Sequence, residues 1–157
     1  MTQRSTHHAT FVIERTYAAS PARVFNAWAE PAAKARWFGG PDEWMKAGHE
    51  LDFRVGGRER LSSRPPGGQA HIFEGRYHDI VTGQRIIYAY DMYFDETRIS
   101  VSLATVEFNR AGAGTRLIFT EQAVFLDGYD DSGSRERGTR ALLDKLDAEL
   151  ERAPAGT

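Results

Sequence analysis

The sequence predicts an α+β fold in which a curved, seven-stranded antiparallel sheet surrounds one long C-terminal helix. A β-rich segment and two short helical segments open the chain, and residues 43–125 then show only strand patterns separated by turn signals. The last apolar repeat has helical spacing and is long enough to cover one face of such a sheet. We expect a single domain over residues 1–157, with an ordered core from about residue 8 to residue 152.

The first strand is predicted at residues 8–17, HATFVIERTY, because apolar and polar residues alternate there and β-forming residues are abundant. Ser20 can cap a helix, and Pro21 suits its first position, so a short helix follows the strand. Pro31 begins a second short helix that runs into Trp37. The Gly-Gly-Pro run that follows is expected to turn the chain across the mouth of a cavity walled by aromatic residues.

Six further strands are predicted between residues 43 and 125. The turn signals that separate them are Gly56-Gly57, PPGG at 65–68, Thr82-Gly83, Asp95-Glu96 and AGAG at 111–114. Such short connections favour an antiparallel meander.

The long helix is predicted from about Ser132 to Arg152, with charged residues between leucines at helical spacing. Asp130, Asp131 and Ser132 are candidate caps. We expect Leu142 and Leu146 to be buried against the sheet.

Composition excludes several functional classes. The net charge of -2 gives no electrostatic footprint for nucleic acid, and no apolar run is long enough to span a membrane. The chain has no cysteine, and its histidines do not show metal-ligand spacing. No phosphate-binding loop or catalytic motif is present. We therefore expect no metal and no cofactor, and a cytoplasmic location, since the N-terminus lacks an apolar signal core.

Strand periodicity predicts an interior face rich in aromatic residues. Asp91 marks the solvent side of residues 85–94, and Arg116 and Thr120 mark that of residues 115–125. The opposite faces, together with the aromatic turn and the long helix, give the candidate ligand-binding residues: Trp37, Phe38, Phe53, Tyr77, Tyr88, Tyr90, Met92, Phe119, Glu121, Phe125, Gly138 and Leu142. Aromatic residues at this spacing can equally be ordinary core.

Two of these candidates have alternative explanations. Glu121 is a carboxylate on an apolar face, so it requires either an ion pair, for example with Arg15 or Arg54, or a wet cavity. Gly138 lies inside the long helix, where glycine costs roughly 1 kcal/mol relative to alanine. Either close packing on the sheet or clearance for a ligand would explain it.

Five motifs, in order, carry a family resemblance over roughly residues 10–152. They are SPARVFNAW at 20–28, Pro31 leading to Trp37-Phe38-Gly39, LDFRVGG at 51–57, Gly75-Arg76-Tyr77 running to Ile80, and GTRL at 114–117. The chain resembles the START-like (SRPBCC) superfamily, and within it the bacterial relatives of the C-terminal domain of the activator of heat-shock protein 90 ATPase. The resemblance implies the helix-grip fold.

The resemblance leaves function open, because helix-grip proteins include binders of hydrophobic molecules as well as cyclases. The first hypothesis is a binder of a hydrophobic or aromatic small molecule between the long helix and the sheet. A polyketide cyclase or aromatase-like enzyme and a chaperone-interacting module are the alternatives, and a homodimer is possible. One departure concerns the long helix, where relatives often carry Gly-Trp and this chain has Gly138-Thr139.

Overall fold

The computed structural model describes residues 4–152 of the chain. Its elements follow the predicted order, namely β1 (Thr6–Tyr17), α1 (Pro21–Ala29), α2 (Pro31–Trp37), β2 (Met45–Leu51), β3 (Arg58–Arg64), β4 (His71–Val81), β5 (Arg85–Phe94), β6 (Thr97–Ala111), β7 (Gly114–Leu126) and α3 (Ser132–Arg152). The first strand begins two residues earlier than predicted. No helix within residues 4–152 is long and apolar enough to cross a membrane.

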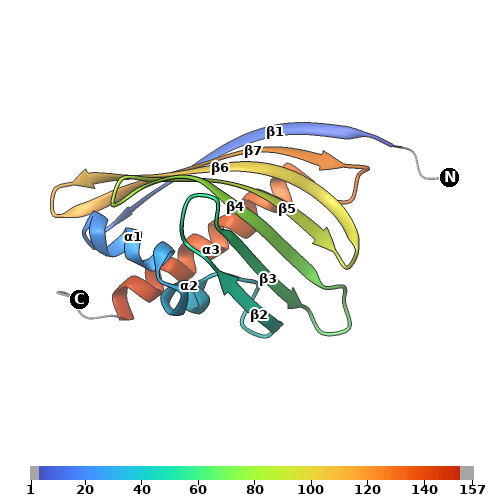
Figure 1. Ribbon diagram of the computed structural model, residues 1–157, viewed down its shortest axis with the longest axis horizontal. Helices are drawn as coiled ribbons and strands as arrows, with labels where there is room; N and C mark the ends of the chain where they lie inside the picture. The colour runs from blue at the N-terminus through green and yellow to red at the C-terminus, as the bar shows by residue number, and fades with distance from the viewer. Residues whose placement is uncertain (1–3, 153–157) are drawn as a thin grey trace.

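All seven strands form one antiparallel sheet in the order β1-β7-β6-β5-β4-β3-β2. The strands from β2 to β7 form the predicted meander, and β1 pairs with β7 to complete the sheet. The sheet arches over α3, while α1 and α2 lie beneath one end of it (Figure 1). The α+β helix-grip prediction is therefore confirmed.

Local sequence explains where each helix begins. The Ser20 side chain accepts a hydrogen bond of 3.3 Å from the backbone N–H of Arg23, and Pro21 occupies the first turn of α1. Glu30 is extended because it precedes Pro31, and this separates α1 from α2. At α3, the Asp131 carboxylate accepts from the backbone N–H of Ser134 at 2.8 Å, which makes it the cap among the three candidates.

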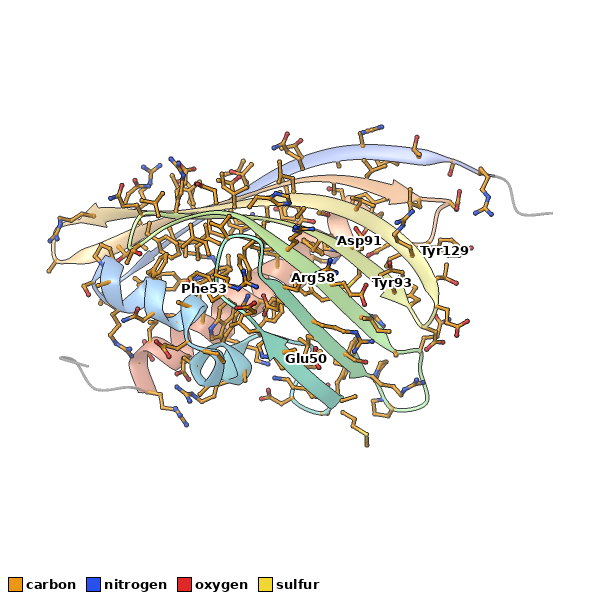
Figure 2. The ribbon with its side chains drawn as sticks, viewed as in Figure 1. Glu50, Phe53, Arg58, Asp91, Tyr93 and Tyr129 are labelled. Atoms are coloured by element: carbon orange, nitrogen blue, oxygen red, sulfur yellow. The ribbon has the colours of Figure 1, made fainter. Side chains whose placement is uncertain are left out.

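The predicted inward faces are the buried ones. In β5, Ile86, Tyr88 and Tyr90 are buried, and the inward residues of β7 are all buried too: Leu117, Phe119, Glu121, Ala123 and Phe125. Side chains fill the space between the sheet and the helices (Figure 2). The concave face of the sheet is thus the core, and any internal site has to lie within it.

The long helix covers this face with Leu143, Leu146 and Leu150, which are all buried. Burial of Leu146 is confirmed. Leu142 was expected to be buried as well, but it is only half-buried, although it packs against the core. Successive helical residues are rotated by about 100°, so Leu142 lies on the flank of the helix when Leu143 faces the sheet.

Candidate functional site

A cavity of about 70 Å³ lies between α3 and the concave face of the sheet, next to the ends of α1 and α2. Its lining is largely aromatic and consists of Trp28, Trp37, Phe38, Phe73, Tyr88, Tyr90, Phe119, Glu121, Arg135, Thr139, Leu142 and Leu143. Strands β4, β5 and β7 supply one wall, and α3 supplies the other. The cavity is therefore an internal space of the helix-grip arrangement, with few polar groups.

Seven of the predicted site residues line this cavity: Trp37, Phe38, Tyr88, Tyr90, Phe119, Glu121 and Leu142. Five do not, namely Phe53, Tyr77, Met92, Phe125 and Gly138. Phe53 lies beyond the end of β2 and packs against Phe25 and Tyr77, with ring centroids 5.7 and 5.0 Å apart (Figure 2). Met92 is half-buried against the core.

The sequence prediction missed five lining residues, Trp28, Phe73, Arg135, Thr139 and Leu143. Phe73 could have been found, since it is separated from Tyr77 by an even number of residues on one strand. Arg135 lies seven residues before Leu142 on α3, and Thr139 lies three residues before it. Helical spacing therefore places both residues on the same side of α3 as Leu142. They were not predicted because both side chains are polar, and polar residues are usually exposed.

Glu121 is fully buried and forms the centre of a polar cluster. Its Oε2 atom accepts hydrogen bonds from Tyr90 at 2.7 Å, from Ser102 at 2.8 Å and from Arg135 at 3.3 Å. The ion-pair explanation therefore holds, but its partner is Arg135, which sequence analysis did not consider. Arg15 instead pairs with Asp144, and Arg54 pairs with Asp52.

Arg135 is buried and balanced by several groups. Its guanidinium donates to Ser100 at 2.7 Å, to Tyr90 at 3.0 Å and to Asp130 at 3.3 Å, besides Glu121. Burial would lower the pKa of Arg135, but Tyr90, Glu121 and Asp130 outweigh this and raise it, so the guanidinium stays charged. Burial and the negative charge of Glu121 also raise the pKa of Tyr90, which keeps its hydroxyl protonated and able to donate.

Two buried polar atoms of the cavity lining have no hydrogen-bond partner among the described residues. One is Oε1 of Glu121, since all three donors in the cluster contact Oε2. The other is Nε1 of Trp28, whereas the neighbouring Trp37 donates its own Nε1–H to the Ala27 carbonyl at 2.9 Å. Buried polar atoms are nearly always hydrogen-bonded, so an unpaired acceptor and an unpaired donor on two residues that line one cavity require an explanation.

Leu142 is the one lining residue that is not buried, and we infer that the mouth of the cavity lies beside it. Gly138 stands one turn before it on α3 and is exposed. Apart from its chain neighbours and the backbone of α3 itself, no atom of residues 4–152 would lie within 4 Å of a Cβ atom on Gly138. Close packing on the sheet, one of its two explanations, is therefore wrong. Gly138 is also absent from the cavity lining, so its other explanation, clearance for a ligand, stays a prediction.

The three tryptophans lie in two separate groups. Trp28 and Trp37 meet edge to face with centroids 4.8 Å apart, and both line the cavity. Trp44 instead packs against His71 at 4.7 Å and over Gly40, where a Cβ would lie 2.5 Å from its ring. The two glycines thus let the chain turn between separate aromatic contacts, and only the first of these belongs to the cavity.

The sequence matches a family of known proteins. Residues 18–151 match the family described as Activator of Hsp90 ATPase homolog 1-like protein. The chain belongs to this family. A comparison with proteins of curated function finds no match.

Solved structures of several bacterial proteins share the fold of this family member. An uncharacterised protein from Rhizobium leguminosarum is 51% identical, with a TM-score of 0.92 over 97% of this chain and 100% of its own. The Mll3558 protein from Rhizobium loti is 46% identical, with a TM-score of 0.85 over 92% of this chain and 99% of its own. An AHSA1-like protein from Aeromonas hydrophila is 21% identical, covers 92% of this chain and 93% of its own, and has a TM-score of 0.71, which supports the fold alone.

In this member of the Activator of Hsp90 ATPase homolog 1-like family, a second polar network is buried beside the cavity. Lys34 of α2 donates to Oε1 of Glu59 at 2.6 Å, the Tyr77 hydroxyl donates to the same oxygen at 2.7 Å, and His49 contacts Oε2 at 2.7 Å. The Lys34 ammonium also lies 4.3 Å from the centre of the Phe38 ring. Sequence analysis missed this pair, although Glu59 shares the strand parity of the buried Leu61.

The buried pair predicts a specific pH dependence. Burial raises the pKa of the Glu59 carboxyl, but Lys34 and the hydrogen bonds from His49, Lys34 and Tyr77 outweigh it, so the pKa lies below the ordinary value of 4.5. A depressed carboxyl pKa means that the unfolded chain binds the proton more tightly than the folded one. The resulting stability is fully present above about pH 5.5 and is lost as the pH falls through 4.5 towards the folded-state pKa.

Urea unfolding between pH 6 and pH 3 measures this contribution as a fall in the free energy of unfolding. The double variant Lys34→Met/Glu59→Leu is the control, since it lacks both charges but keeps every other carboxylate. It should lose less stability on acidification than the wild-type chain. Equal losses in the two proteins would show that Glu59 does not carry the effect.

Proposed function

We propose that the protein binds a small apolar or aromatic molecule in the cavity between α3 and the sheet. The observation that carries the proposal is the combination of an aromatic internal lining with one half-buried lining residue, Leu142, through which the cavity can be reached. Ligand sites of this kind are mostly apolar, with a few polar groups that set the orientation of the ligand. Here Glu121, Arg135 and Tyr90 supply those groups at one corner.

The volume of the cavity limits the ligand. A cavity of 150 Å³ holds a benzene molecule, and sites for drug-sized ligands span about 300–1,000 Å³. At about 70 Å³, this cavity has to expand roughly twofold to accept one ring. Outward movement of Leu142 provides that room, because its side chain already reaches the surface. A multi-ring polyketide would require a much larger rearrangement, so the size favours a binder of single-ring molecules over the cyclase alternative.

An NMR titration with toluene and benzyl alcohol tests this function. The chain has three tryptophans, and their indole N–H resonances report on separate places. Resonances of Trp28 and Trp37 should shift with saturable dependence on ligand, because both rings line the cavity, whereas that of Trp44 should stay in place. Absence of any saturable shift with either compound would refute the proposed function.

A cavity-filling variant supplies the structural control. Thr139 lines the cavity, so Thr139→Met should occupy part of it and weaken binding by at least about tenfold. Ala141 is exposed on the same helix, so Ala141→Met adds a similar side chain outside the cavity and should bind as the wild-type chain does. Equal weakening in both variants would place the binding site elsewhere.

The sequence also leaves open a chaperone partner, which the resemblance suggests, and a homodimer. Both stay predictions, and neither is needed for the cavity to bind a small molecule.

A further inference from the structure

The unpartnered acceptor in the cavity restricts the chemistry of a ligand. Glu121 shows no solvent exposure, and its Oε2 atom already accepts three hydrogen bonds, while Oε1 accepts none from residues 4–152. The nearby positive charge of Arg135 compensates the charge of the carboxylate but does not reach the free oxygen. A donor brought by a ligand would satisfy this oxygen, and a hydrogen bond to a charged acceptor is stronger than one to a neutral acceptor.

The unpartnered donor adds a second requirement. Trp28 is buried in the same lining, and its Nε1–H has no acceptor in the part of the chain that the structure describes. An indole nitrogen can only donate, so a ligand has to offer it an acceptor oxygen or nitrogen. The other lining residues near Trp28 are apolar: Trp37 contacts its ring at 4.8 Å, and Phe119 stacks on it at 6.5 Å.

The same cluster disfavours an anionic ligand. Arg135 is the cationic residue of the lining, and its charge is already balanced by Glu121 at 3.3 Å and Asp130 at 3.3 Å. A carboxylate entering the cavity would therefore meet the negative Glu121 without a free cation among the lining residues. Transfer of an unpaired charge into an apolar space is strongly unfavourable.

We propose that the ligand is a neutral hydroxylated molecule, such as a single-ring aromatic alcohol, whose hydroxyl donates to Oε1 of Glu121 and whose oxygen function accepts from Nε1 of Trp28. This inference rests on the function proposed above. It deepens that function, because it selects alcohols over hydrocarbons, carbonyl compounds and acids of the same size.

Four ligands with the same ring separate the contributions. Toluene offers neither group, benzaldehyde offers an acceptor alone, benzyl alcohol offers both, and benzoate carries the negative charge. For the wild-type protein we expect benzyl alcohol to bind about tenfold or more tightly than toluene, with benzaldehyde between them and benzoate weakest. The NMR titration of the indole resonances gives all four dissociation constants.

The variant Trp28→Phe tests the donor. It should remove the advantage of benzaldehyde over toluene while benzyl alcohol keeps most of its advantage, which comes from Glu121. The matched control is Trp44→Phe, a tryptophan outside the cavity lining, which should leave all four affinities unchanged. The wild-type ligand series needs no variant, so the test stands even if Trp28→Phe folds poorly.

The outcomes of the four titrations distinguish failure of this inference from failure of the proposed function on which it rests. If toluene and benzyl alcohol bind within twofold of each other, the cavity is an apolar site, the two polar atoms are met by water, and the inference is wrong while the proposed function holds. If benzoate binds most tightly, Arg135 is an anion receptor and the inference is wrong. If none of the four binds, the proposed function itself is refuted.

Discussion

Replacing Glu59 with glutamine is expected to lower the free energy of unfolding by about 3–5 kcal/mol, because it leaves the Lys34 ammonium buried without its counter-charge. Both side chains are 1% exposed, and their atoms lie 2.6 Å apart. Burial lowers the pKa of Lys34, and Glu59 acts against that decrease. Without Glu59, the pKa of folded Lys34 should fall further, so that the ammonium can release its proton instead of remaining charged.

Release of this proton gives the Glu59→Gln variant a pH dependence of stability that simple loss of packing would not produce. In Glu59→Gln, folded Lys34 binds its proton less tightly than the unfolded chain does. Stability should therefore rise with pH between the folded-state pKa of Lys34 and its ordinary value of 10.5. Urea unfolding at pH 6, 7.5 and 9 measures the slope, and a flat profile would contradict the proposed origin of the destabilisation.

Two control variants test whether the loss of stability in Glu59→Gln comes from burial of the charge. Arg60 and Glu74 form an exposed ion pair at 3.3 Å, with both side chains 48% exposed, so Glu74→Gln should cost about 1 kcal/mol or less. The double variant Lys34→Met/Glu59→Leu removes the buried charges together and should recover most of the stability lost in Glu59→Gln. A double variant as unstable as the single one would show that shape, and not charge, is what Glu59 provides.

The architecture could be predicted from the apolar patterning because the strands of the sheet and the long helix each bury one face. In β7 the alternation is regular, so parity alone identified Phe119, Glu121 and Phe125 as inward residues. The half-buried Leu142 shows the limit of the same method in α3, since spacing gives the face of a helix but not how far the sheet extends over its flank.

The partners of buried polar residues could not be read from patterning in this way. Arg135 lies fourteen residues from Glu121 and on a different element, and Lys34 is twenty-five residues from Glu59. Arginine and lysine are rarely buried, so neither residue was considered as part of the interior. Their positions follow from the curvature of the sheet, which brings α2 and α3 onto strands that are distant in sequence.

Truncating Leu146 to alanine is the other change for which we expect a large loss of stability, about 2–5 kcal/mol in the free energy of unfolding. Leu146 has no solvent exposure and belongs to the central core, where the sheet and the remainder of α3 prevent the space from collapsing. Leu142→Ala is the matched comparison on the same helix. Leu142 is half-buried at the mouth of the cavity, so its truncation opens existing space to solvent and should cost clearly less. Chemical denaturation of both variants gives the difference in the free energy of unfolding directly.

The two variants also separate stability from ligand binding. Leu142→Ala should widen the entrance and admit toluene more readily, whereas Leu146→Ala should destabilise the protein without improving the binding of toluene. Equal losses of stability would mean that Leu142 supports the helix as Leu146 does, and the entrance would then have to lie at another residue.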